Sequence, residues 1–143
     1  VPQGILGETL ETAVPWSKVN QVKDEANKLL IELHKKHNLP GKPFFCSRVS
    51  KIYHTGICMY NTMGINVRGI KNPEKVFSDI EHALRGCFIK NGGSISHHHG
   101  VGKLRKDFMP VTISDGSIQM IKGIKKFQDP NNIFGINNNI VSE

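Results

Sequence analysis

The residues best suited to chemistry lie in one interior stretch, residues 94–106, with the sequence SISHHHGVGKLRK. Three histidines and two glycines stand there directly before Lys103, Arg105 and Lys106. Histidines exchange protons near neutral pH. Glycine lets the backbone come close to a ligand because it has no Cβ, and basic side chains attract anions. The combination predicts an active-site loop for an anionic, phosphate-bearing substrate with proton transfer beside it.

Two other uses of this loop are disfavoured, and one stays open. In an extended chain His97 and His99 point one way and His98 the other. No carboxylate or cysteine is near in sequence, so no metal site is expected. Residues 100–103 resemble the end of a phosphate-binding P-loop, but the first required glycine is missing and Leu104 replaces the Ser or Thr. A structural glycine turn beside buried histidines remains the alternative.

Composition and charge limit the class of protein. The chain has 143 residues, of which 38% are apolar and 22% charged, as expected for one domain with a buried core. No apolar stretch is long enough to span a membrane. The net charge of +7 favours anionic partners, namely phosphates, nucleic acid or an acidic membrane surface. The chain begins at Val1 without a Met, which suggests a piece of a longer protein.

The three cysteines, Cys46, Cys58 and Cys87, are widely spaced and form no CxxC pair. An odd number without such spacing argues against a disulfide framework or a structural zinc site. We therefore expect three small buried thiols.

The elements that must position the loop follow from hydrophobic periodicity. In order they are a strand over 4–12, a helix from Ser17 to Asn38, strands over 44–53 and 57–68, a helix from Pro73 to Asn91, a short strand at the histidine run, a brief helix over 103–109 stopped by Pro110, and a last helix capped by Ser114. This order predicts an α+β fold, in which an antiparallel sheet of ferredoxin-like arrangement is covered by helices and followed by a C-terminal helical segment.

Three faces carry specific expectations. In the second strand of the pair, a core face is expected for Ile57, Met59, Met63, Ile65 and Val67, and a polar face for Cys58, Tyr60, Thr62, Asn66 and Arg68. A strand tyrosine is ordinarily a packing residue. In the last helix the apolar stripe comprises Ile118, Ile121, Ile124 and Phe127, and Ile133 and Phe134 are expected to anchor the tail.

Five segments, in this order, resemble one enzyme family over essentially the whole chain. They are GILGETLETAVPW, CSRVSKIYHTGICMY, NVRGI, NGGSISHHHGVGKLRK and DPNNIFG. The family is that of the alkyldihydroxyacetonephosphate synthases, a branch of the vanillyl-alcohol-oxidase-like FAD-binding flavoproteins. The triple histidine is specific, because related lactate and glycolate dehydrogenases carry an EHG-type sequence there. The stretch NTMG after Tyr60 and the interruption at Pro110 depart from the family pattern.

The resemblance implies a function for the longer protein. Family members exchange the acyl chain of acyl-dihydroxyacetone phosphate for a fatty alcohol, in peroxisomal ether-lipid synthesis, with FAD as cofactor. Residues 1–92 would form the C-terminal part of the substrate-binding cap domain. Residues 93–143 would form the active-site loop and a helical segment that packs toward an upstream FAD domain. The isolated piece would be inactive, and the full-length enzyme a homodimer that can approach a membrane surface.

The resemblance also implies residue roles. The catalytic pair would be Tyr60, as the base, and His98, as the closest histidine contact. His97, His99, Lys103 and Arg105 would bind the phosphate-bearing substrate, and Gly100 and Gly102 would approach the cofactor. No metal is implied. Arg48 matches a family position, and the residues suggest for it only a strand salt bridge.

Two alternatives remain beside this interpretation. One is the cap fragment of a related FAD-linked 2-hydroxy-acid oxidase or dehydrogenase, against which the triple histidine argues. The other is a basic nucleic-acid-binding module, but the chain has no such motif and no aromatic stacking pattern among its basic residues, so nucleic acid is not an expected partner. The last residues, IVSE, are not a peroxisomal C-terminal signal.

Overall fold

The computed structural model describes residues 3–136 and residue 138, so the terminal IVSE lies outside the described residues. The chain divides into two compact units, Val1–His97 and His98–Glu143. Each unit is described by itself. Within the described residues, no helix is long and apolar enough to cross a membrane.

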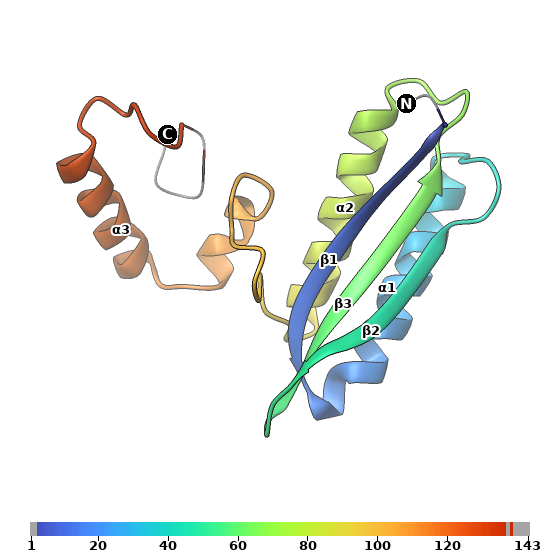
Figure 1. The fold of residues 1–143 in the computed structure, drawn as a ribbon, viewed down its shortest axis with the longest axis horizontal. Coiled ribbons are helices and arrows are strands. Elements are labelled where there is room, and N and C mark those ends of the chain that lie inside the picture. Colours follow the sequence, from blue (N-terminus) through green and yellow to red (C-terminus); the bar gives the residue numbers. More distant parts are fainter. Residues whose placement is uncertain (1–2, 137, 139–143) are drawn as a thin grey trace. The chain divides into compact units, whose positions relative to one another are not determined.

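The first unit is an α+β layer structure, as the sequence predicts. Its elements are β1 (Ile5–Pro15), a short 3-10 helix (Trp16–Lys18), α1 (Val19–Lys36), β2 (Phe44–Ile52), β3 (Gly56–Asn66) and α2 (Pro73–Lys90). The strands form an antiparallel sheet in the order β1-β3-β2. Figure 1 shows α1 and α2 side by side against one face of this sheet. The other face carries no helix of this unit, and we call it the open face.

The core lies between the sheet and the two helices because their apolar faces meet there. The residues predicted for the core face of β3 and just beyond it, Ile57, Met59, Met63, Ile65 and Val67, are all buried. The buried side chains of the helices include Val22, Ala26, Leu30, Ile80, Leu84 and Phe88, at helical spacing. Among the buried polar residues, Asn61 lies fully within β3. Its amide donates to the Leu10 carbonyl at 3.2 Å and accepts from the Ser47 hydroxyl at 2.6 Å, which satisfies it.

The histidine run does not begin as a strand, contrary to expectation. Residues 94–97 instead lie along β1, held by one serine. The Ser94 N–H donates to the Ala13 carbonyl at 2.9 Å, and the Ser94 hydroxyl accepts from the Ala13 N–H at 2.9 Å. The Thr12 hydroxyl donates to the Ser94 carbonyl at 2.9 Å. A side-chain oxygen thus replaces the backbone acceptor that a regular ladder would need.

The second unit contains a 3-10 helix (Lys106–Val111) and α3 (Asp115–Gln128). The expectation that Pro110 stops the first helix is wrong, because Pro110 lies inside it. Proline lacks only the N–H, and its fixed φ suits a short 3-10 turn. Ser114 caps α3 as predicted, with its hydroxyl accepting from the Ser117 N–H at 3.2 Å.

Two of the four residues in the predicted apolar stripe of α3 are exposed in this structure. Ile118 is buried and Ile121 half-buried, but Ile124 is 58% and Phe127 83% exposed. The expectation that Ile133 and Phe134 anchor the tail is also wrong, since both are exposed.

Asp129, directly after α3, organises the tail instead. Its carboxylate accepts from the N–H groups of Ile133 and Phe134, each at 2.9 Å, and pairs with Lys125. The Lys125 ammonium, followed by these two N–H groups, lowers the pKa of Asp129 to about 2.

Candidate functional site

A row of three side chains crosses the open face of the sheet. Glu11 of β1 is the register partner of Tyr60 in β3, and Tyr60 is in turn the partner of Arg48 in β2. Directly opposite residues in antiparallel strands share a face and lie about 5 Å apart at Cβ. The Arg48 guanidinium carbon is 4.7 Å from the centroid of the Tyr60 ring, a cation–π contact. Tyr60 is half-buried. It lies on the face opposite Met59 and Asn61, as the alternation predicts.

Glu11 connects this row to the first histidine. Glu11 is buried, with only 3% of the residue's surface exposed. Oε1 accepts from the Ser96 hydroxyl at 2.8 Å and from the His97 backbone N–H at 2.7 Å. Oε2 lies 3.9 Å from Nδ1 of the His97 ring. A buried carboxylate requires such donors, so Glu11 holds the start of the histidine run on the open face.

Tyr53 supplies the second contact of the His97 ring. It follows β2, in the turn where its N–H donates to the Gly56 carbonyl at 2.8 Å. Its hydroxyl is hydrogen-bonded to Nε2 of His97, and the ring centroids are 5.8 Å apart. A hollow of about 300 Å³ borders Tyr53 and is otherwise lined by the ends of β1 and β3 with Thr55.

Glu11 and Tyr53 were not predicted as site residues. Glu11 is adjacent to the histidines only because residues 94–97 fold onto β1, and its sequence neighbours give no signal of this. Tyr53 had been assigned to the end of a strand without a role.

The sequence predicts no metal site because no carboxylate or cysteine is near the histidines in sequence, but both kinds of ligand are near them in space. A carboxylate and a thiol do approach the histidine run in space, because ligand atoms of Glu11, Cys58 and His97 lie within 4.8 Å of one another. In this arrangement the carboxylate and the imidazole are engaged by protein donors and acceptors. Cys58 is buried as expected, Cys87 is partly covered, and Cys46 is exposed, which corrects the expectation of three buried thiols.

The remaining loop residues lie in the second unit. The rings of His98 and His99 meet edge to face with centroids 4.5 Å apart. Arg105 is buried. Its Nη1 donates to the Gly100 carbonyl at 3.0 Å and its Nη2 lies 3.5 Å from Nδ1 of His99. Arg105 therefore braces the loop, while Lys103 is exposed.

Both loop glycines have left-handed backbone conformations. The φ angle is 76° at Gly100 and 53° at Gly102, values that side chains other than glycine rarely adopt. A Cβ at Gly100 would meet no atom within 4 Å. The backbone at Gly100 is therefore open on the side where a Cβ would stand.

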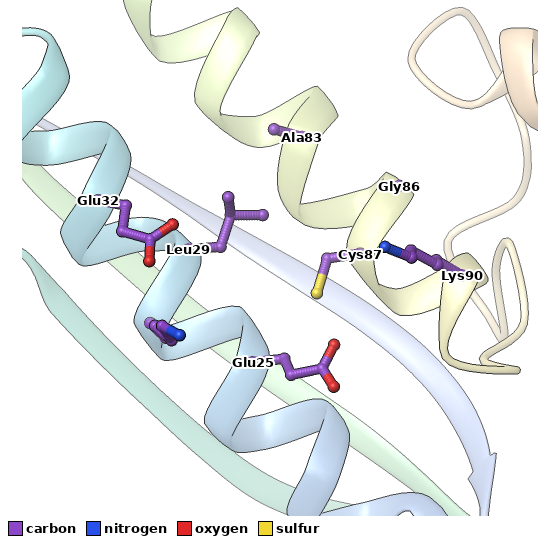
Figure 2. A pocket seen from close by; sticks show the side chains of 8 residues that line it. Glu25, Leu29, Glu32, Ala83, Gly86, Cys87 and Lys90 are labelled. Atoms are coloured by element: carbon purple, nitrogen blue, oxygen red, sulfur yellow. The ribbon is translucent and has the colours of Figure 1, made fainter.

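A separate groove of about 470 Å³ lies between α1 and α2. Figure 2 shows Glu25, Leu29 and Glu32 from α1 facing Ala83, Cys87 and Lys90 from α2. Hydrogen bonds from Gln21 and Asn91 lower the pKa of Glu25. Burial, followed by the charge of Glu25, raises the pKa of the Cys87 thiol, which keeps it protonated and weakly nucleophilic. None of the predicted site residues lines this groove.

With this geometry in view, comparison with known proteins assigns the chain to a family. Residues 2–136 match the family described as "FAD linked oxidases, C-terminal domain". The chain belongs to this family.

Among curated relatives, the alkyldihydroxyacetonephosphate synthase of Caenorhabditis elegans is 43% identical over 131 residues, which are 92% of this chain and 22% of the relative. The same enzyme of Dictyostelium discoideum is 25% identical over 88% of this chain and 20% of the relative. These matches confirm the resemblance inferred from the motifs. The chain spans about a fifth of the length of these relatives.

Solved structures confirm the fold class. Two structures of an alkyldihydroxyacetonephosphate synthase align with 89% of this chain, at TM-scores of 0.57 and 0.61 and identities of 16% and 17%. The chain covers 18% and 19% of those structures. A probable D-2-hydroxyglutarate dehydrogenase of Oryza sativa subsp. indica is 33% identical, but only over 48% of this chain and 12% of the relative.

Proposed function

We propose that the chain is the C-terminal part of a peroxisomal, FAD-dependent alkylglycerone-phosphate synthase. This enzyme would replace the acyl chain of acyl-dihydroxyacetone phosphate with a fatty alcohol and release a fatty acid. The observation that carries the proposal is the 43% identity to the Caenorhabditis elegans alkyldihydroxyacetonephosphate synthase across 92% of the chain. The weaker and shorter match to the dehydrogenase makes the 2-hydroxy-acid reaction the second candidate.

We propose that the two parts of this chain have different roles in the longer protein. Residues 1–92 belong to the substrate-binding cap domain. Residues 93–143 form the active-site loop and a helical segment that packs toward the FAD domain. FAD is bound mainly outside this chain and supplies a flavin ring that acts on the substrate carbon without net oxidation. The backbone at Gly100 and Gly102 is the part of this chain that approaches it. The full-length enzyme is a homodimer that can work at a membrane surface, where its fatty alcohol is found.

Tyr60 is the proposed base that removes a proton from the substrate carbon and later returns it. The contact with Arg48 supports this role, because its guanidinium carbon lies 4.7 Å from the Tyr60 ring centroid and this cation–π contact holds the ring in place on the open face. A phenol positioned in this way can transfer its proton as a general acid or base. His98 is the proposed histidine contact at the reacting carbon, and charge stabilisation there is its expected contribution.

The phosphate of the substrate is proposed to bind the cationic part of the loop. Lys103 is exposed and can reach an anion. Arg105 is proposed to contribute through Nη2 and the edge of His99, because its Nη1 already donates to the Gly100 carbonyl. His97 and His99 orient the dihydroxyacetone phosphate group.

The proposal is tested by Tyr60→Phe in the full-length protein. We expect exchange of a labelled fatty alcohol into acyl-dihydroxyacetone phosphate to be lost, while the far-UV circular dichroism and the melting temperature change little, because the ring and its contact with Arg48 remain. Tyr53→Phe removes the phenol in the turn after β2, which contacts His97, and a smaller effect is expected. Normal exchange by the Tyr60 variant would refute the assignment.

The second candidate is distinguished by a redox assay. Reduction of the bound flavin by lactate, glycolate or 2-hydroxyglutarate, without alkyl exchange, would identify a 2-hydroxy-acid dehydrogenase. We expect exchange without accumulation of reduced flavin.

A further inference from the structure

We propose that Glu11 and Tyr53 are positioning residues for His97, and that Glu11 holds its neutral imidazole with the proton on Nδ1. This inference deepens the proposed function and rests on it for its catalytic meaning. Its structural content stands on the contacts of these three side chains alone.

The backbone of His97 is fixed before its ring is considered. Ser94 is bound to β1 through three hydrogen bonds of 2.9 Å with Thr12 and Ala13. Two residues later, Oε1 of Glu11 accepts from the Ser96 hydroxyl and the His97 N–H. A strand therefore determines the position of the His97 Cα, although the residue lies in a loop. Sites supported by strands are more precise than sites on loops alone.

The ring of His97 faces a different group at each nitrogen. Nδ1 looks toward Oε2 of Glu11 at 3.9 Å, and Nε2 is hydrogen-bonded to the Tyr53 hydroxyl. An ionised carboxylate can only accept hydrogen bonds, whereas a phenol can donate or accept. The arrangement of lowest electrostatic energy therefore places the proton on Nδ1 and lets the Tyr53 hydroxyl donate to Nε2. The group that faces the other nitrogen determines the tautomer of a histidine.

Charge on the ring has the same partner. If His97 takes up a second proton, Glu11 lies close enough to stabilise the imidazolium, in the way a buried carboxylate supports a catalytic histidine. Other titratable groups near this ring are Tyr53 itself and the Cys58 thiol. Glu11 is a buried carboxylate, and its Oε1 accepts two hydrogen bonds. The ring of His97 is thereby held in one orientation at the open face. The histidines that follow it remain available for direct contact with substrate.

The tautomer can be measured directly. In the chain labelled with ¹⁵N-histidine, long-range ¹H–¹⁵N spectra at a pH where His97 is neutral distinguish protonated Nδ1 from protonated Nε2. His97→Gln assigns the signal. We expect protonated Nδ1 in the unmodified chain and in Tyr53→Phe. In Glu11→Gln we expect a shift toward protonated Nε2 or a mixture, because the amide no longer repels a bare Nδ1.

Glu8→Gln is the control, since Glu8 is another glutamate of β1 but is half-buried and belongs to the helix-facing side of the strand. Its spectrum should match that of the unmodified chain. Protonated Nε2 in the unmodified chain would overturn the proposal, whatever the variants do. An unchanged tautomer in a folded Glu11→Gln chain would do the same.

A kinetic measurement on the full-length protein gives the catalytic meaning. Loss of a residue that orients a metal-binding histidine typically lowers affinity or activity by about 10- to 100-fold, and a similar loss is expected for a residue that orients a catalytic histidine. We expect kcat to fall in this range in Glu11→Gln with little change in KM, and Glu11→Asp to recover part of the loss. Exchange unaffected by Glu11→Gln would contradict the catalytic role. A protein with the expected tautomer but no exchange activity at all would instead contradict the proposed function and leave the positioning intact.

Discussion

Arg48 is the residue on the open face whose charge cannot be removed by pH, because a guanidinium stays protonated throughout the accessible range. It stacks on Tyr60 from an edge strand and is itself exposed. Its contribution should therefore be electrostatic, with little effect on folding.

Replacing Arg48 with Met should lower the rate at which the full-length protein exchanges the acyl chain for a fatty alcohol, without unfolding the protein. A cation–π contact is worth about 0.5–2 kcal/mol, so we expect a loss in kcat on the order of tenfold. Steady-state kinetics of alkyl exchange provide the measurement.

Two further variants serve as controls for Arg48→Met. Arg48→Lys should recover part of the activity, since it keeps the charge. Lys51→Met removes a cation from the neighbouring row of β2, opposite Cys58, and should leave kcat unchanged. An unaltered kcat in Arg48→Met would show that Arg48 does not support Tyr60.

At this scale the sequence predicts types of residue better than partners. The face of Tyr60 follows from alternation along one strand, and the histidines stand out by their spacing. Glu11 and Tyr53 could not be found in this way, because they lie 86 and 44 residues from His97 in the chain. Only the pairing of β1 with the loop and the turn after β2 brings them to one ring.

At the scale of elements, local periodicity predicted the three strands and the three α-helices, with bounds that differ by a few residues. It failed where tertiary contacts override local preference. The expected fourth strand is reduced to the bonds of Ser94, whose hydroxyl takes one of the two ladder positions. Glu81 and Arg85, for which the periodicity gives no specific expectation, form a buried ion pair within α2. No local signal distinguishes a buried pair from an exposed one.

Gly93 lies where the loop leaves α2, and Gly93→Ala should weaken the attachment of the loop to β1. A Cβ at this position would lie too close to the Thr12 hydroxyl and 2.8 Å from the Phe88 carbonyl oxygen. Since one obstacle is backbone, relief requires a shift of the segment. Overpacking of this kind costs about 1–3 kcal/mol. We expect a lower midpoint in urea denaturation and faster amide exchange at Ser94, whose N–H bonds to β1.

The control for Gly93→Ala is Gly123→Ala, in α3. A Cβ at Gly123 meets no atom within 4 Å, and alanine is favoured over glycine in a helix by about 1 kcal/mol. That variant should be neutral or slightly stabilising. Equal stability of the Gly93 and Gly123 variants would contradict the steric argument.

At the scale of the whole molecule, the second unit carries apolar surface that the described part of the chain does not cover. Met120, Ile124 and Phe127 are 64%, 58% and 83% exposed on α3. Exposed apolar patches of this kind commonly mark interfaces. The chain covers only about a fifth of its curated relatives, which provides a candidate for what covers α3, namely the rest of the proposed enzyme.

The last prediction therefore concerns FAD and α3 together. The chain alone should bind FAD weakly, because its described contribution is the open backbone around Gly100, whereas the full-length protein should bind it tightly. Amide exchange in α3 should slow in the full-length protein, since covering Ile124 and Phe127 would stabilise the helix. Fluorescence titration with FAD and hydrogen exchange measured on both forms provide the comparison. Tight binding by the chain alone, or equal exchange of α3 in both forms, would mean that the cofactor site and the partner of α3 lie elsewhere than we propose.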